Sequence, residues 1–377
     1  MTPIKMVDLK KQYLNIKNEI DAAFLEVMDS SIFVGGKHVA EFSTNLANYL
    51  GSKHVIPCAN GTDALQVAIM ALDLKPGDEV ITPSFTYIAT TEVIALLKLK
   101  AVFVDVDTKT FCIDPVAIKN AITSKTKAIV PVHLYGHAAN MEEIMAIAGE
   151  HNLFVIEDNA QAIGSDYTFS DGTKQKTGTI GTIGCTSFFP SKNLGCYGDG
   201  GALCTDDDGL AERIKMIANH GQKIRYYHEM VGCNSRLDSL QAAVLNIKLP
   251  LLDNYIAARR KAADRYDRGF AGQPKIGIPF RAEYCKHVFH QYTITLNGPD
   301  RDRLHDWLEK NNIPCMIYYP VPAHRQKMFD ALGGSSYHLP NTDWLTERVI
   351  SLPMHTELEE DQQEFIIQKV IEFVKTT

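Results

Sequence analysis

The sequence predicts an α/β protein: a mainly parallel, mixed sheet covered by helices on both faces, followed by a smaller α+β domain. The large part is predicted by short apolar runs that alternate with helical patterns and are separated by Gly and Pro turns. The small part is predicted by a change after Gly272-Gln273-Pro274, where apolar residues alternate as in a half-buried strand. We therefore expect a large domain at residues 1–250 and a small C-terminal domain at residues 251–377.

Helices and strands of the large domain follow in a regular order. Asp8 is placed to cap a first helix that runs towards Met28. Polar, glycine-containing residues at 168–181 are expected to form an exposed loop. The expected strands are 54–58, 79–82, 101–105, 128–132, 153–157 and 202–205, with helical patterns between most of them.

The helix that starts after Asn60 is apolar nearly all round, so we expect it to be buried. The first N–H groups of a buried helix need an acceptor. Either a phosphate or the Thr62 hydroxyl would supply one, and the sequence favours neither.

A long helical pattern runs from Leu237 to about Phe270 and should break at Pro250. The small domain then follows. Its expected elements are a strand at 288–296, a helix around 304–308, a strand-like run at 316–319 and a terminal helix at 366–374.

Composition excludes several classes of protein. The net charge of −7 argues against nucleic acid as the main partner. None of the eight cysteines forms a C-x-x-C pair, so no zinc or redox motif and no metal site is expected. The first residues lack the apolar core of a signal peptide, and the apolar stretch 93–104 is interrupted by Lys98 and Lys100. We therefore expect a protein of the reducing cytoplasm with no membrane span.

One stretch carries the chemistry: residues 185–201 place Lys192 between an apolar run and a glycine-rich turn. Most lysines are solvated surface charges, but two other features of the sequence suggest that Lys192 has a functional role. Asp158 ends an expected buried strand, and Gly61-Thr62 open the buried helix. Together these features suggest pyridoxal phosphate (PLP): the lysine forms the Schiff base, the acid pairs with the pyridinium nitrogen and the helix N-terminus holds the phosphate.

Position supports a single site. Asn60, Tyr87, His133 and Asp158 all follow expected strands, where ligands gather in parallel sheets. Residues 220–238 are poor in apolar side chains and rich in hydrogen-bond donors. They form either a contact with an anionic ligand or a solvated connection.

Four motifs in order resemble one family. The chain is similar to the sugar-nucleotide aminotransferases (transaminases) of the DegT/DnrJ/EryC1/StrS family, which are fold-type I PLP enzymes. The motifs are Ala59-Asn60-Gly61-Thr62-Asp63-Ala64-Leu65, Glu157-Asp158-Asn159-Ala160-Gln161, Ser187-Phe188-Phe189-Pro190-Ser191-Lys192 and Gly232-Cys233-Asn234-Ser235-Arg236-Leu237-Asp238.

The resemblance implies a role for each matched position. Lys192 looks like the lysine that forms the Schiff base and later moves the proton, and Asp158 looks like the partner of the pyridine nitrogen. Asn234 resembles a residue that reaches the phosphate from the neighbouring subunit, which implies a homodimer with shared active sites. The other implied cofactor contacts are Gln161 at the ring hydroxyl, Tyr87 on the ring face, and Gly61, Thr62 and Ser187 at the phosphate.

Within the family, residues 188–201 and 234–238 look like the aminotransferases that aminate carbon 3 of UDP-2-acetamido-2-deoxy-3-oxo-glucuronate, with L-glutamate as donor and 2-oxoglutarate as product. Those enzymes serve surface polysaccharide biosynthesis, such as that of the lipopolysaccharide O-antigen. A uronate carboxylate suits a guanidinium, so Arg236 is the first candidate and Arg225 the second. Weaker pocket candidates, for which packing is an equal alternative, are Tyr318, Tyr319 and His324.

Two departures from the family pattern are Asn159, where a small or apolar residue is frequent, and Ala323, where leucine is common. Two alternative functions stay open. One is aminotransfer to another dTDP- or UDP-linked 3-keto or 4-keto deoxysugar. The other is a non-catalytic, PLP-binding regulatory protein.

Overall fold

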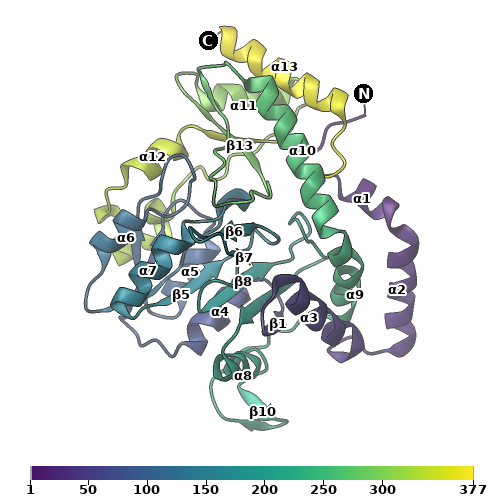
Figure 1. Cartoon of the computed structure of the whole chain (residues 1–377), viewed down its shortest axis with the longest axis vertical. Helices are drawn as coiled ribbons and strands as arrows, with labels where there is room; N and C mark the ends of the chain where they lie inside the picture. The colour runs from purple at the N-terminus through teal and green to yellow at the C-terminus, as the bar shows by residue number, and fades with distance from the viewer. Residues whose placement is uncertain (1, 377) are drawn as a thin grey trace.

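The computed structural model of the chain describes residues 2–376 (Figure 1). Within them, seven strands form the central sheet, and β9 alone runs antiparallel to its neighbours. In sheet order the strands are β1 (His54–Cys58), β9 (Gly201–Thr205), β8 (Ile183–Ser187), β5 (Phe154–Asp158), β4 (Thr126–Ile129), β2 (Glu79–Pro83) and β3 (Lys100–Val104). The predicted fold class, a mainly parallel mixed sheet, is confirmed.

Helices cover both faces of this sheet because successive side chains of a strand point to opposite faces. Val80 and Ile156 enter one core, whereas their neighbours Ile81 and Val155 enter another. On the first face lie α4 (Gly61–Ala71), α5 (Ala89–Leu96) and α8 (Asp208–Ile217). On the second face lie α6 (Pro115–Ala121), α7 (Met141–His151), α3 (Gly36–Leu50) and α9 (Ser239–Lys248).

A second sheet lies in the C-terminal part, at the top of Figure 1. It is antiparallel and consists of β12 (Ile276–Gly277), β13 (Tyr292–Leu296) and β14 (Val349–Leu352). It shares a core with α10 (Leu252–Phe270), α11 (Arg301–Lys310) and α13 (Glu360–Thr376). The N-terminal segment crosses to this part, since Lys11 pairs with Glu359 at 2.6 Å. The domain division at residue 250 stays a prediction.

Several local expectations can be compared with the structure. Asp8 does cap the first helix by accepting from the N–H of Lys11, but the helix breaks at Ile16 into α1 (Leu9–Asn15) and α2 (Lys17–Ser30). Pro250 lies in a 3-10 turn, η2 (Leu249–Leu251), between α9 and α10, as expected.

The expected exposed loop at 168–181 includes one strand of the hairpin β6 (Asp166–Thr168) and β7 (Lys174–Lys176), and residues 220–238 include the hairpin β10 (Gln222–Ile224) and β11 (Tyr227–His228). The remaining elements are η1 (Leu134–Gly136), η3 (Ala323–Arg325), η4 (Lys327–Leu332), η5 (Gly334–Ser336) and α12 (Pro340–Thr346). Residues 2–376 include no helix with both the length and the apolar character to cross a bilayer.

A buried hydrogen bond joins the segment that follows β4 to the end of β5. His133 and Glu157 have fully buried side chains, and His133 Nε2 lies 2.8 Å from a Glu157 oxygen. The N–H of Ala139 donates to His133 Nδ1, so the ring hydrogen is on Nε2 and points at Glu157. The Glu157 carboxylate also accepts from the N–H groups of Gly178, Ile180 and Gly181, at 2.6–2.8 Å.

Replacing Glu157 with glutamine should lower the free energy of unfolding by about 3 kcal/mol, because the amide NH₂ would face backbone donors that now point at a carboxylate oxygen. Urea unfolding followed by circular dichroism measures the change. The exposed Glu150 on α7 is the matched control, and its glutamine variant should stay within about 0.5 kcal/mol of the wild type. Equal stability of the two variants would contradict the role given to the buried pair.

Candidate active site

A cavity of about 450 Å³ lies beyond the C-terminal ends of the parallel strands. Its walls come from segments that follow β1, β2, β5 and β8, as expected for a parallel sheet, and from the C-terminal part of the chain. The structure brings nine of the predicted site residues to this one cavity: Gly61, Thr62, Tyr87, Asp158, Gln161, Ser187, Lys192, Tyr318 and Tyr319.

Lys192 lies on the loop that follows β8, and its backbone N–H donates to the carbonyl of Phe189 at 2.8 Å. Lys192 lines the cavity, and its Nζ makes no hydrogen bond or ion pair within residues 2–376. Burial lowers the pKa of the Lys192 amine to about 8, against the attraction of Asp158 for the charged form. The amine is therefore much closer to the neutral, nucleophilic state than that of an exposed lysine.

Asp158 is the buried acid of the site. Its oxygens accept from Thr90 Oγ1 at 2.7 Å and from the N–H of Ala160 at 3.2 Å. Burial raises the pKa of Asp158, while these two donors and the charge of Lys192 oppose the rise. A carboxylate held in this way can accept a hydrogen bond from a protonated ring nitrogen of a bound ligand.

The N-terminus of α4 opens on the same cavity. The side chain of Asn60 accepts from the N–H of Asp63 at 2.8 Å, so Asn60 caps the helix and Thr62, one of the two alternatives that the sequence left open, does not. The N–H groups of Gly61 and Thr62 have no acceptor within the helix. A Cβ at Gly61 would lie 2.6 Å from the Cβ of Ser187, so only glycine lets the helix approach β8 this closely. These features suit a phosphate group.

Aromatic rings and one amide complete the wall. Tyr87 is 57% exposed, and its ring centroid lies 6.0 Å from that of Tyr319. Gln161 accepts from the N–H of Tyr135 at 2.7 Å and donates to the Tyr319 hydroxyl at 3.0 Å, which fixes the orientation of its amide. A free amine, a buried acid, an open helix N-terminus and an aromatic face thus fit the functional groups of PLP.

Four predicted residues do not line the cavity. Asn234, Arg236 and Arg225 are exposed on the segment that includes the β10–β11 hairpin. His324 is buried, and its Nδ1 lies 2.7 Å from Ser84 Oγ. The structure therefore corrects the pocket interpretation of His324 in favour of packing. In a single chain, most of residues 220–238 are exposed, and none of them lines the cavity.

The sequence analysis missed several wall residues. His290 and Gln291 reach the cavity from the segment before β13, and Tyr135 reaches it from η1. His290 is 6% exposed, its pKa is held well below the ordinary value by burial, and its Nδ1 has no hydrogen-bond partner in the described part of the chain. The available signal was a histidine inside an otherwise apolar alternation.

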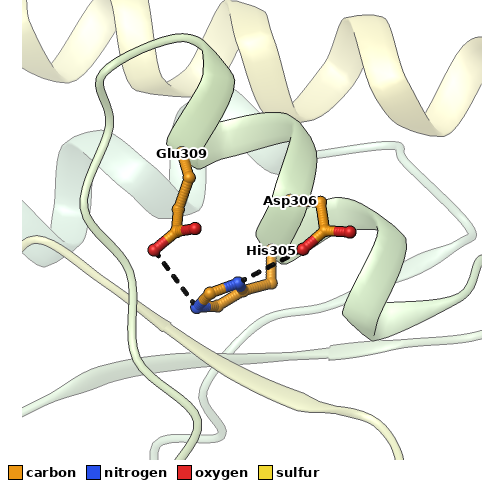
Figure 2. A group of neighbouring side chains, drawn as sticks. All are labelled: His305, Asp306 and Glu309. Carbon is orange, nitrogen blue, oxygen red and sulfur yellow. Dashed lines mark ion pairs between the residues drawn. The ribbon is translucent and has the colours of Figure 1, made fainter.

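A group with metal-ligating side chains lies elsewhere. Figure 2 shows His305 on α11 between Asp306 and Glu309 of the same helix, at 3.9 Å from each. Both acids are exposed, so these are ordinary ion pairs on the surface of a helix. The group does not line the cavity and takes no part in the site.

Comparison with known proteins agrees with this geometry. The sequence model of the DegT/DnrJ/EryC1/StrS aminotransferase family matches residues 14–371. A pleiotropic regulatory protein of Geobacillus stearothermophilus is 46% identical over 374 residues, 99% of either chain. A UDP-2-acetamido-2-deoxy-3-oxo-D-glucuronate aminotransferase of Pseudomonas aeruginosa is 45% identical over 356 residues, 94% of this chain and 96% of the relative.

The fold is shared as well. The crystal structure of DesV from S. venezuelae, in complex with a ketimine intermediate, superposes with a TM-score of 0.94 at 38% identity, covering 100% of this chain and 99% of the other. Fold type I is therefore confirmed. With a family match over residues 14–371, the chain belongs to the DegT/DnrJ/EryC1/StrS aminotransferase family.

Proposed function

We propose that the chain is a PLP-dependent aminotransferase that moves an amino group from L-glutamate to carbon 3 of UDP-2-acetamido-2-deoxy-3-oxo-glucuronate. One observation carries the proposal: the unpaired amine of Lys192 and the buried carboxylate of Asp158 line one cavity beside the open N-terminus of α4. The relative from Pseudomonas, at 45% identity, supports the choice of sugar.

Each side chain of the cavity has a distinct role in the proposed reaction. When bound, PLP supplies an aldehyde for primary amines and a ring that accepts the electrons of a breaking C–H bond. Lys192 would offer the neutral amine that reacts with the aldehyde and, once released, would move the proton. Asp158 would keep a proton on the ring nitrogen, and Tyr87 would cover one face of the ring. Gly61, Thr62 and Ser187 would hold the phosphate, and Gln161 would hold the ring hydroxyl.

The carboxylates of glutamate and of the uronate need a cationic partner, and Arg236 is our first candidate, with Arg225 second. Tyr318 and Tyr319 also line the cavity and are weaker candidates for contacts with the substrate. Because Arg236 and Asn234 are exposed and outside the cavity of their own chain, we propose that a second copy of the chain presents them to it.

Exposed apolar side chains support this homodimer. Ile32, Phe33 and Val34 are 45–52% exposed, and Val34 pairs with Asp238 next to the Asn234–Arg236 segment. On the neighbouring hairpin and the residues after it, Tyr226 and Val231 are 74% and 84% exposed. Exposed apolar side chains of this size are typical of surfaces that are covered in a protein–protein interface.

A non-catalytic regulatory role is the second candidate, favoured because the Geobacillus relative is described as a pleiotropic regulatory protein. The combination of an unpaired lysine with a low pKa and a buried aspartate argues against it, because regulation by ligand binding alone requires neither.

The function is tested by absorbance spectroscopy of the PLP-loaded protein. We expect a yellow band that L-glutamate bleaches and that UDP-2-acetamido-2-deoxy-3-oxo-glucuronate restores. Lys192→Ala should lose this cycle, whereas Lys174→Ala, a control at an exposed lysine, should keep it. Bleaching without restoration would reject the sugar in favour of another keto-sugar. A protein that binds PLP but ignores glutamate would support the regulatory candidate.

Amine labelling at a series of pH values tests the state of Lys192 in the PLP-free protein. Acylation of Lys192, followed by mass spectrometry, should rise with a midpoint at about pH 8, whereas exposed lysines rise near their ordinary pKa of about 10.4. In Asp158→Asn the midpoint should move to lower pH, because the carboxylate charge favours the ammonium form. A midpoint near that of exposed lysines would contradict the burial argument.

Mixing two inactive variants tests the shared site. A dimer of one Lys192→Ala chain and one Arg236→Ala chain retains one site with both residues intact if Arg236 acts on the neighbouring chain. Activity should therefore reappear after the variants are unfolded and refolded together. The control pair, Lys192→Ala with Asp158→Ala, should stay inactive because both residues belong to the same chain's cavity. Failure of the first pair, with dimers seen by light scattering, would place Arg236 in its own chain's site.

A further inference from the structure

Lys248, the last residue of α9, is a buried cation outside the cavity. It is 1% exposed, and its Nζ donates to the carbonyl of Gly195 at 2.8 Å. The same Nζ lies 4.3 Å from the ring centroid of Tyr197. In the described residues no carboxylate pairs with it. Burying an ammonium group without a counter-ion is unfavourable, so stability alone does not account for a lysine at this position.

The carbonyl that Lys248 holds belongs to the turn that carries Lys192. Gly195 comes three residues after Lys192 in the loop between β8 and β9. The loop is closed at its base, where Phe188 donates to Gly200 at 2.7 Å and accepts from Cys196 at 2.8 Å.

The turn is also tightly packed around Lys192. A Cβ at Gly195 would lie 2.3 Å from the carbonyl oxygen of Pro190, so the residues before and after Lys192 are in close contact. The geometry of the Lys192 backbone therefore depends on where Gly195 is fixed.

Helix α9 contacts this loop at a second point. Gln241 accepts from the N–H of Tyr197 at 2.8 Å. Gln241 and Lys248 are seven residues apart on α9, so they lie on the same face of the helix. Two side chains of α9 therefore hold two neighbouring backbone groups of the loop. A lysine–carbonyl contact of this kind fixes the turn without occupying the cavity.

We propose that Lys248 is a positioning residue that clamps the Gly195 carbonyl to α9 and so holds the turn that directs Lys192 into the cavity. The consequence for catalysis rests on the proposed function, but the clamp does not. Methionine in place of Lys248 has a similar length and would fill the same space, but it would leave the Gly195 carbonyl without its hydrogen-bond donor. The loop then loses its fixed position although the fold is kept.

Hydrogen–deuterium exchange on the PLP-free protein tests the clamp directly. Lys248→Met should increase exchange in residues 188–200 and leave the rest of the chain unchanged. The matched control is Lys176→Met, since Lys176 also lies over a tyrosine ring, at 5.2 Å from that of Tyr49, and near a glycine carbonyl, at 3.4 Å from that of Gly164, but outside this loop. The thermal midpoint of Lys248→Met should be equal to or above that of the wild type, because the buried charge is gone.

Kinetics then link the clamp to Lys192. In the PLP-loaded protein, Lys248→Met should slow the bleaching by saturating glutamate at least about tenfold with little change in KM, because a displaced amine impairs the chemical step. Lys248→Arg, which keeps a cationic donor, should recover part of the rate.

Unchanged exchange in residues 188–200 overturns the proposal, as does a raised exchange throughout the chain with a lower thermal midpoint. A Lys248→Met chain that does not fold also overturns it, because the proposal requires the fold to tolerate methionine. If the wild type does not bind PLP, the proposed function fails, whereas the exchange experiment still decides the clamp.

Discussion

The buried end of β5 is the constraint on which the rest of the site depends. Consecutive residues of a strand point to opposite faces, so Glu157 and Asp158 are directed into different environments. A buried carboxylate must be compensated by hydrogen-bond donors or positive charge. Glu157 accepts from His133 and from three backbone N–H groups. Within residues 2–376, Asp158 accepts from Thr90 and Ala160 alone, so it retains capacity for one more donor on the cavity side.

Close backbone approach places the other groups around Asp158. Gly61 packs on Ser187, and a Cβ at Gly201 would lie 2.4 Å from the carbonyl oxygen of Asn60. The start of α4 and the ends of β8 and β9 are thereby pressed together without side chains between them. The N–H groups of α4 and the loop of Lys192 open on one cavity as a result, and the distance between them is set by backbone contacts that no flexible side chain can relax.

The sequence predicted well what depends on periodicity. Apolar runs located the strands, and because parallel strands end at one edge, Asp158 and Gly61 were expected to meet there. The sequence was a poor guide to features that depend on tertiary contacts, such as the cap of α4 and the residues that reach the cavity from distant segments. Asn60 and Thr62 are both capping residues, and only the extended backbone of Asn60 decides between them. His290 comes from a distant segment, and nothing local indicates that it faces Lys192 rather than the interior of the small sheet.

The burial of Lys248 is another feature that depends on a tertiary contact and could not be predicted from the sequence. A lysine in the last turn of a helix is expected at the surface, where it would complement the helix dipole. The structure buries it instead, because the loop after Lys192 packs over the end of α9. That contact joins Lys248 to Gly195, more than fifty positions away, so no sequence pattern within either segment predicts it.

Lys192 and Lys248 show that desolvation alone does not make a lysine nucleophilic. Desolvation lowers the pKa of both Lys192 and Lys248 to about 8. The amine of Lys248 donates to a carbonyl and lies against an aromatic ring, so its hydrogen is engaged and its lone pair, when present, is enclosed. The amine of Lys192 has neither contact and is open to a 450 Å³ cavity opposite a carboxylate. Both pKa values are lowered to about 8, so the different roles assigned to the two amines rest on what each amine touches.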